Sequence, residues 1–240
     1  MNTPDKDKLN TSMRLLGLHR GEACGAYDAV AADYDGFANL WDRHIAAPAL
    51  EFYNLLIRQH VRPGALVLDA GAGTGERTLA LLRDGRPGAV IGLDASAGML
   101  SVARSKIDDQ RVRFLQGDIT HLPFDDNIFD VVSCTWVVEI LADPHAAVRE
   151  FVRVIKPDGV VIYTFCSLPE GVVGDMLQNL IARVSSEHSP LTHLLHETER
   201  PFHHCDRSRL VQFAGGLTTV AMVAKCCPIT DVFVPCALAI

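Results

Sequence analysis

Residues 68–76 read LDAGAGTGE, an apolar strand end that runs into a glycine-rich turn. Gly71 and Gly73 let the backbone approach a bound molecule closely, because no Cβ atom intervenes. The turn lacks the Lys-Ser/Thr ending of a Walker phosphate loop, and Glu76 stands where the dinucleotide fingerprint has glycine or alanine. The stretch therefore predicts a ligand-binding loop and excludes a Walker-type nucleotide site.

Strands and helices alternate on both sides of this loop. The predicted strands are ALVLDA (65–70), AVIGLD (89–94), VRFLQGD (112–118), FDVVSCTWVV (129–138) and GVVIYTF (159–165). Helical patterns occupy 44–60, 77–83 and 146–156, and Ser96 and Asp143–Pro144 are typical of helix starts. Repeated β-α-β units of this kind predict an α/β fold with a doubly wound, mostly parallel Rossmann-like sheet and helices on both faces.

The C-terminal third predicts a small helical cap and a closing antiparallel strand pair. Apolar residues between 172 and 184 follow a helical period, and the runs TTVAMVAKCC (218–227) and DVFVPCALAI (231–240) read as two strands. We therefore expect an N-terminal lid over 1–43, a ligand-binding core over 44–166, cap helices around a substrate pocket over 167–218, and the closing strand pair over 219–240.

Length and charge limit the class of partner. The 240 residues suit one large domain with a cap, and a formal charge of −7 argues against a nucleic-acid binder that neutralises phosphates. Apolar stretches end well before the roughly 18 residues of a membrane span, and the N-terminus lacks the apolar core of a secretory signal. We expect a cytoplasmic monomer or homodimer that acts on a small molecule, with no nucleic-acid partner and no stable membrane insertion.

Acidic residues follow several of the predicted strands. Asp69, Asp94 and Asp118 stand at three strand ends, and ligands of doubly wound sheets bind at that edge. Asp94 follows the glycine loop by about 20 residues, the spacing at which an acid binds ribose hydroxyls. These acids favour a ligand that carries hydroxyls, amines and positive charge.

The chain resembles the class I S-adenosylmethionine-dependent methyltransferases of the small-molecule type, which include enzymes of ubiquinone and menaquinone biosynthesis. The residues that carry the resemblance are LDAGAGTGE (68–76), GLDAS (92–96), GDITHLPF (117–124), FDVVSCTWVVEIL (129–141) and REFVRVIKPDG (149–159). YDAVAADYD (27–35) is similar to the lid of such enzymes, and FHHCDRSRLVQFAGG (202–216) is similar to the helix before their final strand pair. Ile140 departs from the family, where many relatives have histidine, and KPDG replaces the commoner KPGG.

The resemblance implies a role for each site residue. Gly71 and Gly73 would bracket the methionine part of S-adenosylmethionine, and Asp69 would lie near its ammonium. Asp94 would bind the ribose hydroxyls, and Asp118 would accept a hydrogen bond from the adenine amino group. The implied cofactor-binding set is Tyr34, Asp69, Gly71, Ala72, Gly73, Asp94, Ala95, Met99, Asp118, Ile119, Cys134 and Thr135. The substrate candidates are Tyr27, Trp136 and His203, and the candidates for a catalytic base are Glu139 and His204. The reaction is expected to be an in-line methyl transfer that needs no metal.

Each assignment has a structural alternative. Asp94 could cap a helix, Asp118 could cap a turn, Tyr27 and Tyr34 could be packing residues on one helix face, and Trp136 could fill the core. The functional alternatives are a metalloid methyltransferase that uses Cys226 and Cys227, a catalytically silent cofactor-binding subunit, and an NAD-dependent oxidoreductase. The histidines at 188, 193, 196, 203 and 204 show no metal-ligand spacing.

Overall fold

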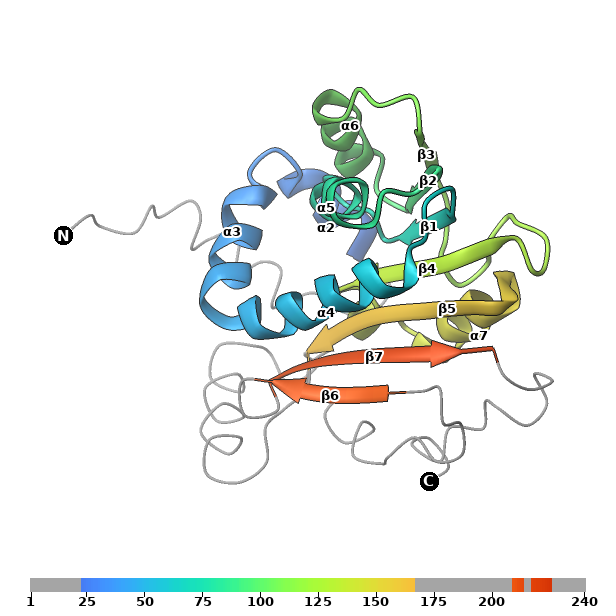
Figure 1. Ribbon diagram of the computed structural model, residues 1–240. Coiled ribbons are helices and arrows are strands. Elements are labelled where there is room, and N and C mark those ends of the chain that lie inside the picture. The colour runs from blue at the N-terminus through green and yellow to red at the C-terminus, as the bar shows by residue number, and fades with distance from the viewer. Residues whose placement is uncertain (1–22, 167–208, 214–216, 226–240) are drawn as a thin grey trace.

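The computed structural model describes residues 23–166, 209–213 and 217–225, which form a sheet of seven strands covered by helices (Figure 1). The strand order is β3-β2-β1-β4-β5-β7-β6. The strands are β1 (Leu66–Ala70), β2 (Ala89–Asp94), β3 (Val112–Gln116), β4 (Phe129–Thr135), β5 (Ile155–Cys166), β6 (Arg209–Phe213) and β7 (Thr218–Ala224). Strands β1 to β5 are parallel and β7 is antiparallel to both of its neighbours, which confirms the predicted doubly wound sheet with an antiparallel C-terminal pair.

Helices cover both faces of the sheet because its strands are apolar on both sides. The helices are α2 (Ala23–Val30), α3 (Tyr34–Trp41), α4 (Ala47–His60), α5 (Glu76–Gly85), α6 (Ala97–Lys106) and α7 (Pro144–Val154), with a π-helical turn η1 (Asp42–Ala46) and a 3₁₀ turn η2 (Val138–Ile140). On β1, Val67 packs with Tyr53 of α4 and Leu81 of α5, whereas Leu68 packs with Phe151 of α7. The alternation of side chains along one strand thus builds two cores. None of the helices in the described part of the chain is long and apolar enough to cross a membrane.

Two helix starts follow from local hydrogen bonds, as predicted. The Ser96 hydroxyl accepts a hydrogen bond from the Met99 N–H at 3.0 Å and caps α6. The Asp143 carboxylate accepts from the N–H groups of His145 and Ala146 at 2.9 and 3.0 Å, and Pro144 takes the first helical position of α7. These caps satisfy backbone donors that have no partner inside the helix.

The end of α7 differs from the prediction. The sequence predicts helix through Lys156, but α7 ends at Val154 and Ile155 already pairs with Phe129 of β4. The pairing then moves to Val131 with Val160, so the KPDG segment bulges out of the ladder. The Lys156 ammonium binds the Asp130 carboxylate at 2.8 Å and holds this bulge against β4.

The closing strand pair is only partly as predicted. The first predicted strand is present as β7, but its described partner is β6 (Arg209–Phe213), which precedes it in the chain. The prediction of helix over 202–216 is therefore wrong for 209–213, and so is the assignment of that stretch to cap helices. All residues of β7 are buried, so the backbone groups on both of its edges need ladder partners. The backbone of β5 pairs with one edge and the backbone of β6 pairs with the other. The predicted strand at 231–240 and the predicted helix at 172–184 lie outside the described residues.

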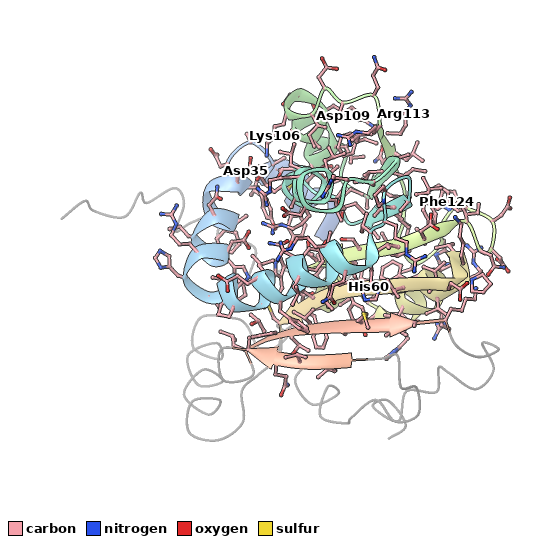
Figure 2. The ribbon with its side chains drawn as sticks, viewed as in Figure 1. Asp35, His60, Lys106, Asp109, Arg113 and Phe124 are labelled. Atoms are coloured by element: carbon pink, nitrogen blue, oxygen red, sulfur yellow. The ribbon has the colours of Figure 1, made fainter. Side chains whose placement is uncertain are left out.

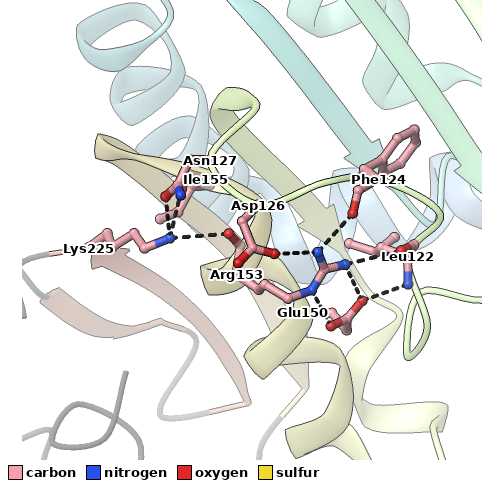
Figure 3. A network of polar contacts seen from close by, with 8 residues as sticks. All are labelled: Leu122, Phe124, Asp126, Asn127, Glu150, Arg153, Ile155 and Lys225. Carbon is pink, nitrogen blue, oxygen red and sulfur yellow. Dashed lines mark hydrogen bonds and ion pairs between the residues drawn. The ribbon is translucent and has the colours of Figure 1, made fainter. Parts of the chain in front are cut away.

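A polar network anchors the loop between β3 and β4 to α7 (Figure 3). The Arg153 guanidinium donates to both oxygens of Glu150 at 2.7 Å, to the Phe124 and Leu122 carbonyls at 2.8 and 3.1 Å, and to Asp126 at 2.8 Å. Glu150 also accepts from the Leu122 N–H at 2.8 Å. Three-quarters of the Arg153 side chain is shielded from water, so these bonds have no equivalent replacement from solvent.

We predict that Arg153→Met lowers the free energy of unfolding by about 2 to 3 kcal/mol, because two carbonyls and two carboxylates lose a charged donor. Urea denaturation should show a lower midpoint with an unchanged m-value. Arg149→Met on the same helix is the matched control. Its ion pair with Asp143 is more than half exposed, and we expect a change below about 0.5 kcal/mol. Equal losses in the two variants would contradict the proposed importance of the network.

Candidate functional site

A cavity of about 170 Å³ lies at the carboxyl ends of β1, β2 and β4, where the strand order reverses. It brings together most of the predicted cofactor residues: Tyr34, Gly71, Ala72, Gly73, Asp94, Ala95, Met99, Asp118, Ile119 and Thr135. The predicted substrate residues Tyr27 and Trp136 also line it. His203 and His204 lie outside the described residues.

The backbone of the glycine loop bends sharply over the end of β2. The Leu93 carbonyl accepts from the N–H groups of Gly71 and Ala72 at 2.7 and 3.0 Å. Gly71 has a φ of +77°, and a Cβ atom there would lie 2.5 Å from Cγ2 of Val137. Gly73 has a φ of +53°, but no atom lies within 4 Å of the position of its Cβ. Glycine is therefore required at 71 by both conformation and space, and at 73 by conformation alone.

The Asp94 carboxylate joins the glycine loop to the start of α6. Its Oδ2 accepts from the Gly73 N–H and its Oδ1 accepts from the Ser96 N–H, both at 2.8 Å. Burial raises the pKa of this carboxyl, although the two backbone hydrogen bonds oppose the rise. Because Ser96 caps α6, the alternative of a helix cap does not account for Asp94.

The Asp118 carboxylate fits the turn-capping alternative and also lines the cavity. Its Oδ1 accepts from the backbone N–H and the hydroxyl of Thr120 at 2.8 and 2.7 Å. Burial opposes ionisation, but the bonds from Thr120 and the His121 side chain outweigh it and lower the pKa of Asp118. A role in adenine binding stays a prediction.

Asp69 and Cys134 lie beneath the cavity rather than in its wall. Both are almost fully buried, and the Asp69 Oδ2 accepts from the Thr78 hydroxyl of α5 at 2.5 Å. The Asp69 Oδ1 has no hydrogen-bond partner, and burial raises the pKa of this carboxyl to about 6. Asp69 thus contributes negative charge from below the glycine loop.

Glu139 is a buried acid behind the cavity wall. It lies on η2, is 4% exposed, and its Oε1 accepts from the Cys166 N–H at 3.3 Å. Its Oε2 has no hydrogen-bond partner, and burial raises the pKa of this carboxyl to about 7. The following residues, Ile140 and Leu141, line the cavity instead. The site therefore places Glu139 next to the cavity wall but not in it.

The segment Ala23–Ala46, which we call the cover, closes one side of the cavity with aromatic rings. Tyr27 and Tyr34 line the cavity, with ring centroids 5.9 Å apart in an edge-to-face contact. Trp41 packs edge-to-face on Trp136 with centroids 6.0 Å apart. Trp136 has a φ of +58°, and its indole nitrogen is buried without a hydrogen-bond partner. A left-handed conformation is rare for a bulky residue and indicates that the turn after β4 is held by its surroundings.

Each of these cover aromatics is followed by an aspartate that anchors the cover to the core. The dipeptides Tyr27-Asp28, Tyr34-Asp35 and Trp41-Asp42 recur every seven residues. The Asp28 Oδ1 accepts from the Ser96 hydroxyl and the Gly98 N–H at 2.5 and 2.7 Å.

The other two aspartates contact the elements around the glycine loop. The Asp35 carboxylate accepts from the Thr74 hydroxyl at 2.5 Å and binds the Lys106 ammonium, whose side chain lies on the neighbouring helix α6 (Figure 2). The Asp42 Oδ2 binds the Arg77 guanidinium at 2.5 Å. The repeat was a signal that our sequence analysis missed, as it missed Thr74 and Arg77 as wall residues.

Metal binding has no candidate in the parts of the chain that the structure describes. No group of three or more His, Cys, Asp or Glu side chains there is arranged to hold an ion. The two cysteines with described side chains in the core, Cys134 and Cys166, are free thiols, and burial raises the pKa of both.

We predict that Gly71→Ala lowers the free energy of unfolding by about 2 kcal/mol more than Gly73→Ala. Both variants place a Cβ on a left-handed residue, but only the first drives it into Val137. Thermal unfolding of the two variants measures the difference. Similar losses would show that the contact with Val137 relaxes freely.

We predict that Glu139→Gln changes how stability depends on pH. A folded-state pKa of about 7, against 4.5 for the free group, means that wild type loses stability as the pH rises through this interval. Relative to the glutamine variant, the loss should reach about 3 kcal/mol, as measured by urea denaturation between pH 4.5 and 8. Glu51→Gln, on an exposed position of α4, is the control and should follow wild type. Parallel curves for wild type and Glu139→Gln would contradict the prediction.

Comparison with known proteins finds a family that matches part of this chain. Residues 68–163 match the family described as "Methyltransferase domain". The demethylmenaquinone methyltransferase of Lactiplantibacillus plantarum is 35% identical over 61% of this chain and 63% of its own length. The demethylmenaquinone methyltransferase of Clavibacter sepedonicus is 33% identical over 66% of this chain and 64% of its own length. The ubiquinone/menaquinone biosynthesis C-methyltransferase UbiE of Idiomarina loihiensis is 35% identical over 60% and 58%. The chain thus spans less than two thirds of the length of these curated relatives.

Solved structures show the same fold. A chain from the complex between the Haloferax volcanii Trm112 methyltransferase activator and the putative methyltransferase has a TM-score of 0.55 at 23% identity, over 82% of this chain and 96% of that one. The Bacillus subtilis YcgJ protein has a TM-score of 0.50 at 24% identity, over 71% and 95%. The matched domain and the curated relatives make this chain similar to the class I S-adenosylmethionine-dependent methyltransferases, and its sheet order agrees with that similarity.

Proposed function

We propose that this protein binds S-adenosylmethionine in the cavity and transfers its methyl group to a small, partly apolar metabolite. The observation that carries the proposal is the position of Asp94, an acid in the cavity wall that is bonded directly to the backbone of the glycine loop. In a methyltransferase domain, this arrangement puts a hydroxyl-binding acid beside a loop that a ligand can approach closely.

The wall residues fit the parts of this cofactor. The Asp94 oxygens accept backbone hydrogen bonds from Gly73 and Ser96, and a carboxylate has about four acceptor sites, so it keeps capacity for ribose hydroxyls. Met99 and Ile119 offer apolar surface for adenine, with Asp118 beside them as an acceptor for its amino group. The buried Asp69 supplies negative charge beneath Gly71, which suits an ammonium and a sulfonium.

The cavity wall also offers surface for an apolar acceptor. Tyr27, Tyr34 and Trp136 present aromatic surface, Ile140 and Leu141 add aliphatic surface, and the two tyrosines also pack against Met99. The relatives named above act, by their names, on demethylmenaquinone or in ubiquinone and menaquinone biosynthesis. A quinol-like ring is therefore the first acceptor to test.

Protein residues would orient the acceptor and remove its proton. When bound, S-adenosylmethionine supplies a methyl carbon on a sulfonium, which the acceptor attacks in line with the departing sulfur. Glu139 precedes the wall residue Ile140 and has a buried Oε2 without a partner. It is our candidate for the proton acceptor because a carboxyl with a pKa near 7 exchanges protons readily at neutral pH. His204 as a base and His203 as a substrate contact remain predictions.

The alternative functions gain no support from the described residues or the relatives. Cys226 and Cys227, which a metalloid methyltransferase would use, lie outside the described residues. No comparison favours an NAD-dependent oxidoreductase or a silent subunit. We further expect the protein to act in the cytoplasm as a monomer or homodimer.

We predict that S-adenosylhomocysteine binds with micromolar affinity in isothermal titration, and that Asp94→Ala weakens binding at least ~30-fold, because two hydroxyls lose their charged acceptor. Asp109→Ala is the matched control, since Asp109 pairs with Arg111 in the connection between α6 and β3 and does not line the cavity. A folded wild type that binds neither S-adenosylhomocysteine nor S-adenosylmethionine would overturn the proposal.

Acceptors are then screened by the mass increase of one methyl group, starting with a soluble demethylmenaquinol analogue. Methylation of the analogue by wild type and its loss in Glu139→Gln, with S-adenosylhomocysteine affinity retained, would support Glu139 as the proton acceptor. Full activity of Glu139→Gln would exclude that role.

A further inference from the structure

The cavity wall contains one cation among mostly neutral and acidic residues. Of the residues that line the cavity in the described part of the chain, Arg77 carries a positive charge, and Asp42, Glu76, Asp94 and Asp118 carry negative charge. Arg77 lies in the first turn of α5, directly after the glycine loop. The positive end of the α5 dipole adds to the guanidinium at this point.

The Arg77 guanidinium is occupied by a carboxylate from the cover. The Asp42 Oδ2 lies 2.5 Å from the Arg77 Nη2, and about one fifth of each side chain is exposed. Asp42 belongs to η1, whereas Arg77 belongs to the core. Partly buried ion pairs gain little net free energy, because the loss of hydration offsets most of the attraction. One carboxylate can therefore replace another at Arg77 at low cost.

The remaining anchors of the cover do not involve Arg77. Asp28 binds Ser96 and Gly98, and Asp35 binds Thr74 and Lys106. Release of Asp42 would leave α2 and α3 attached to the core. The pair of Arg77 and Asp42 is thus the one described anchor whose core partner also lines the cavity as a cation.

We propose that Arg77 binds the α-carboxylate of the methionine part of S-adenosylmethionine, and that Asp42 is an internal competitor that this carboxylate displaces. The inference rests on the proposed function and adds a binding residue to it. It follows from the location of Arg77 beside the loop that would hold the methionine part, and from the exchangeable carboxylate already bound there.

The test compares two ligands that differ in this carboxylate alone, S-adenosylmethionine and decarboxylated S-adenosylmethionine, by isothermal titration. Arg77→Gln should weaken binding of the first ~10-fold or more and leave the second nearly unchanged, because one charge-assisted contact is lost. Arg77→Lys should restore part of the affinity for the carboxylate-bearing ligand that Arg77→Gln loses. Asp42→Asn should strengthen binding of the carboxylate-bearing ligand severalfold, because it removes the competitor.

The double variant Asp42→Asn/Arg77→Gln separates competition for Arg77 from simple charge repulsion between Asp42 and the ligand carboxylate. If Asp42 acts through Arg77, Asp42→Asn has no effect on ligand selectivity in the Arg77→Gln background. Asp35→Asn removes another cover carboxylate and should change both affinities alike. Binding of the decarboxylated ligand by each variant shows that its pocket is folded.

The outcomes distinguish this inference from the proposed function. Normal binding by wild type with no change in ligand selectivity in Arg77→Gln and Arg77→Lys would overturn the inference and leave the proposed function intact. If Asp42→Asn strengthens binding of the carboxylate-bearing ligand and the same gain persists when Arg77→Gln is also present, the proposed competition is overturned. Absence of binding of both ligands to folded wild type would overturn the proposed function and, with it, the inference.

Discussion

The hydrogen bonds of the Asp94 carboxylate hold together the two loops that form the cavity. One oxygen accepts from the glycine loop after β1 and the other accepts from Ser96 at the start of α6. The neighbouring Leu93 carbonyl accepts from Gly71 and Ala72 in the same loop. Because β1 and β2 are adjacent and parallel, these bonds hold a loop of left-handed glycines in one shape. The rest of the cavity wall comes from the cover and from the turn after β4.

The cover uses a seven-residue period for two purposes at once. Tyr27 lies on α2 and Tyr34 lies on α3, and both line the cavity. Neighbouring residues on a helix point in directions about 100° apart, so the aspartates that follow the two tyrosines reach different anchors on the core. The same short segment closes the cavity and attaches itself to the loops that build it.

Acidic groups dominate the electrostatics around the cavity at a cost in stability. Burial raises the pKa of Asp69 and Glu139, which means that the fold would be more stable with both carboxyls neutral. Such a cost is typical of functional sites, where charge is arranged for a ligand rather than for the fold. A cationic ligand would recover part of this cost. Among the described residues that line the cavity, Arg77 is the one cation that can face an anionic group.

The sequence by itself determined the doubly wound core and the cap of Ser96 on α6, because these follow from local periodicity and short-range hydrogen bonds. It also identified the glycine loop and Asp94 as one site, because the carboxyl ends of parallel strands meet at one edge. Only the tertiary structure decided that Arg209–Phe213 pairs with β7, since the choice of a ladder partner depends on which edge is free. Only the tertiary structure paired Arg77 with Asp42, because a contact between a core helix and the cover depends on how distant segments pack.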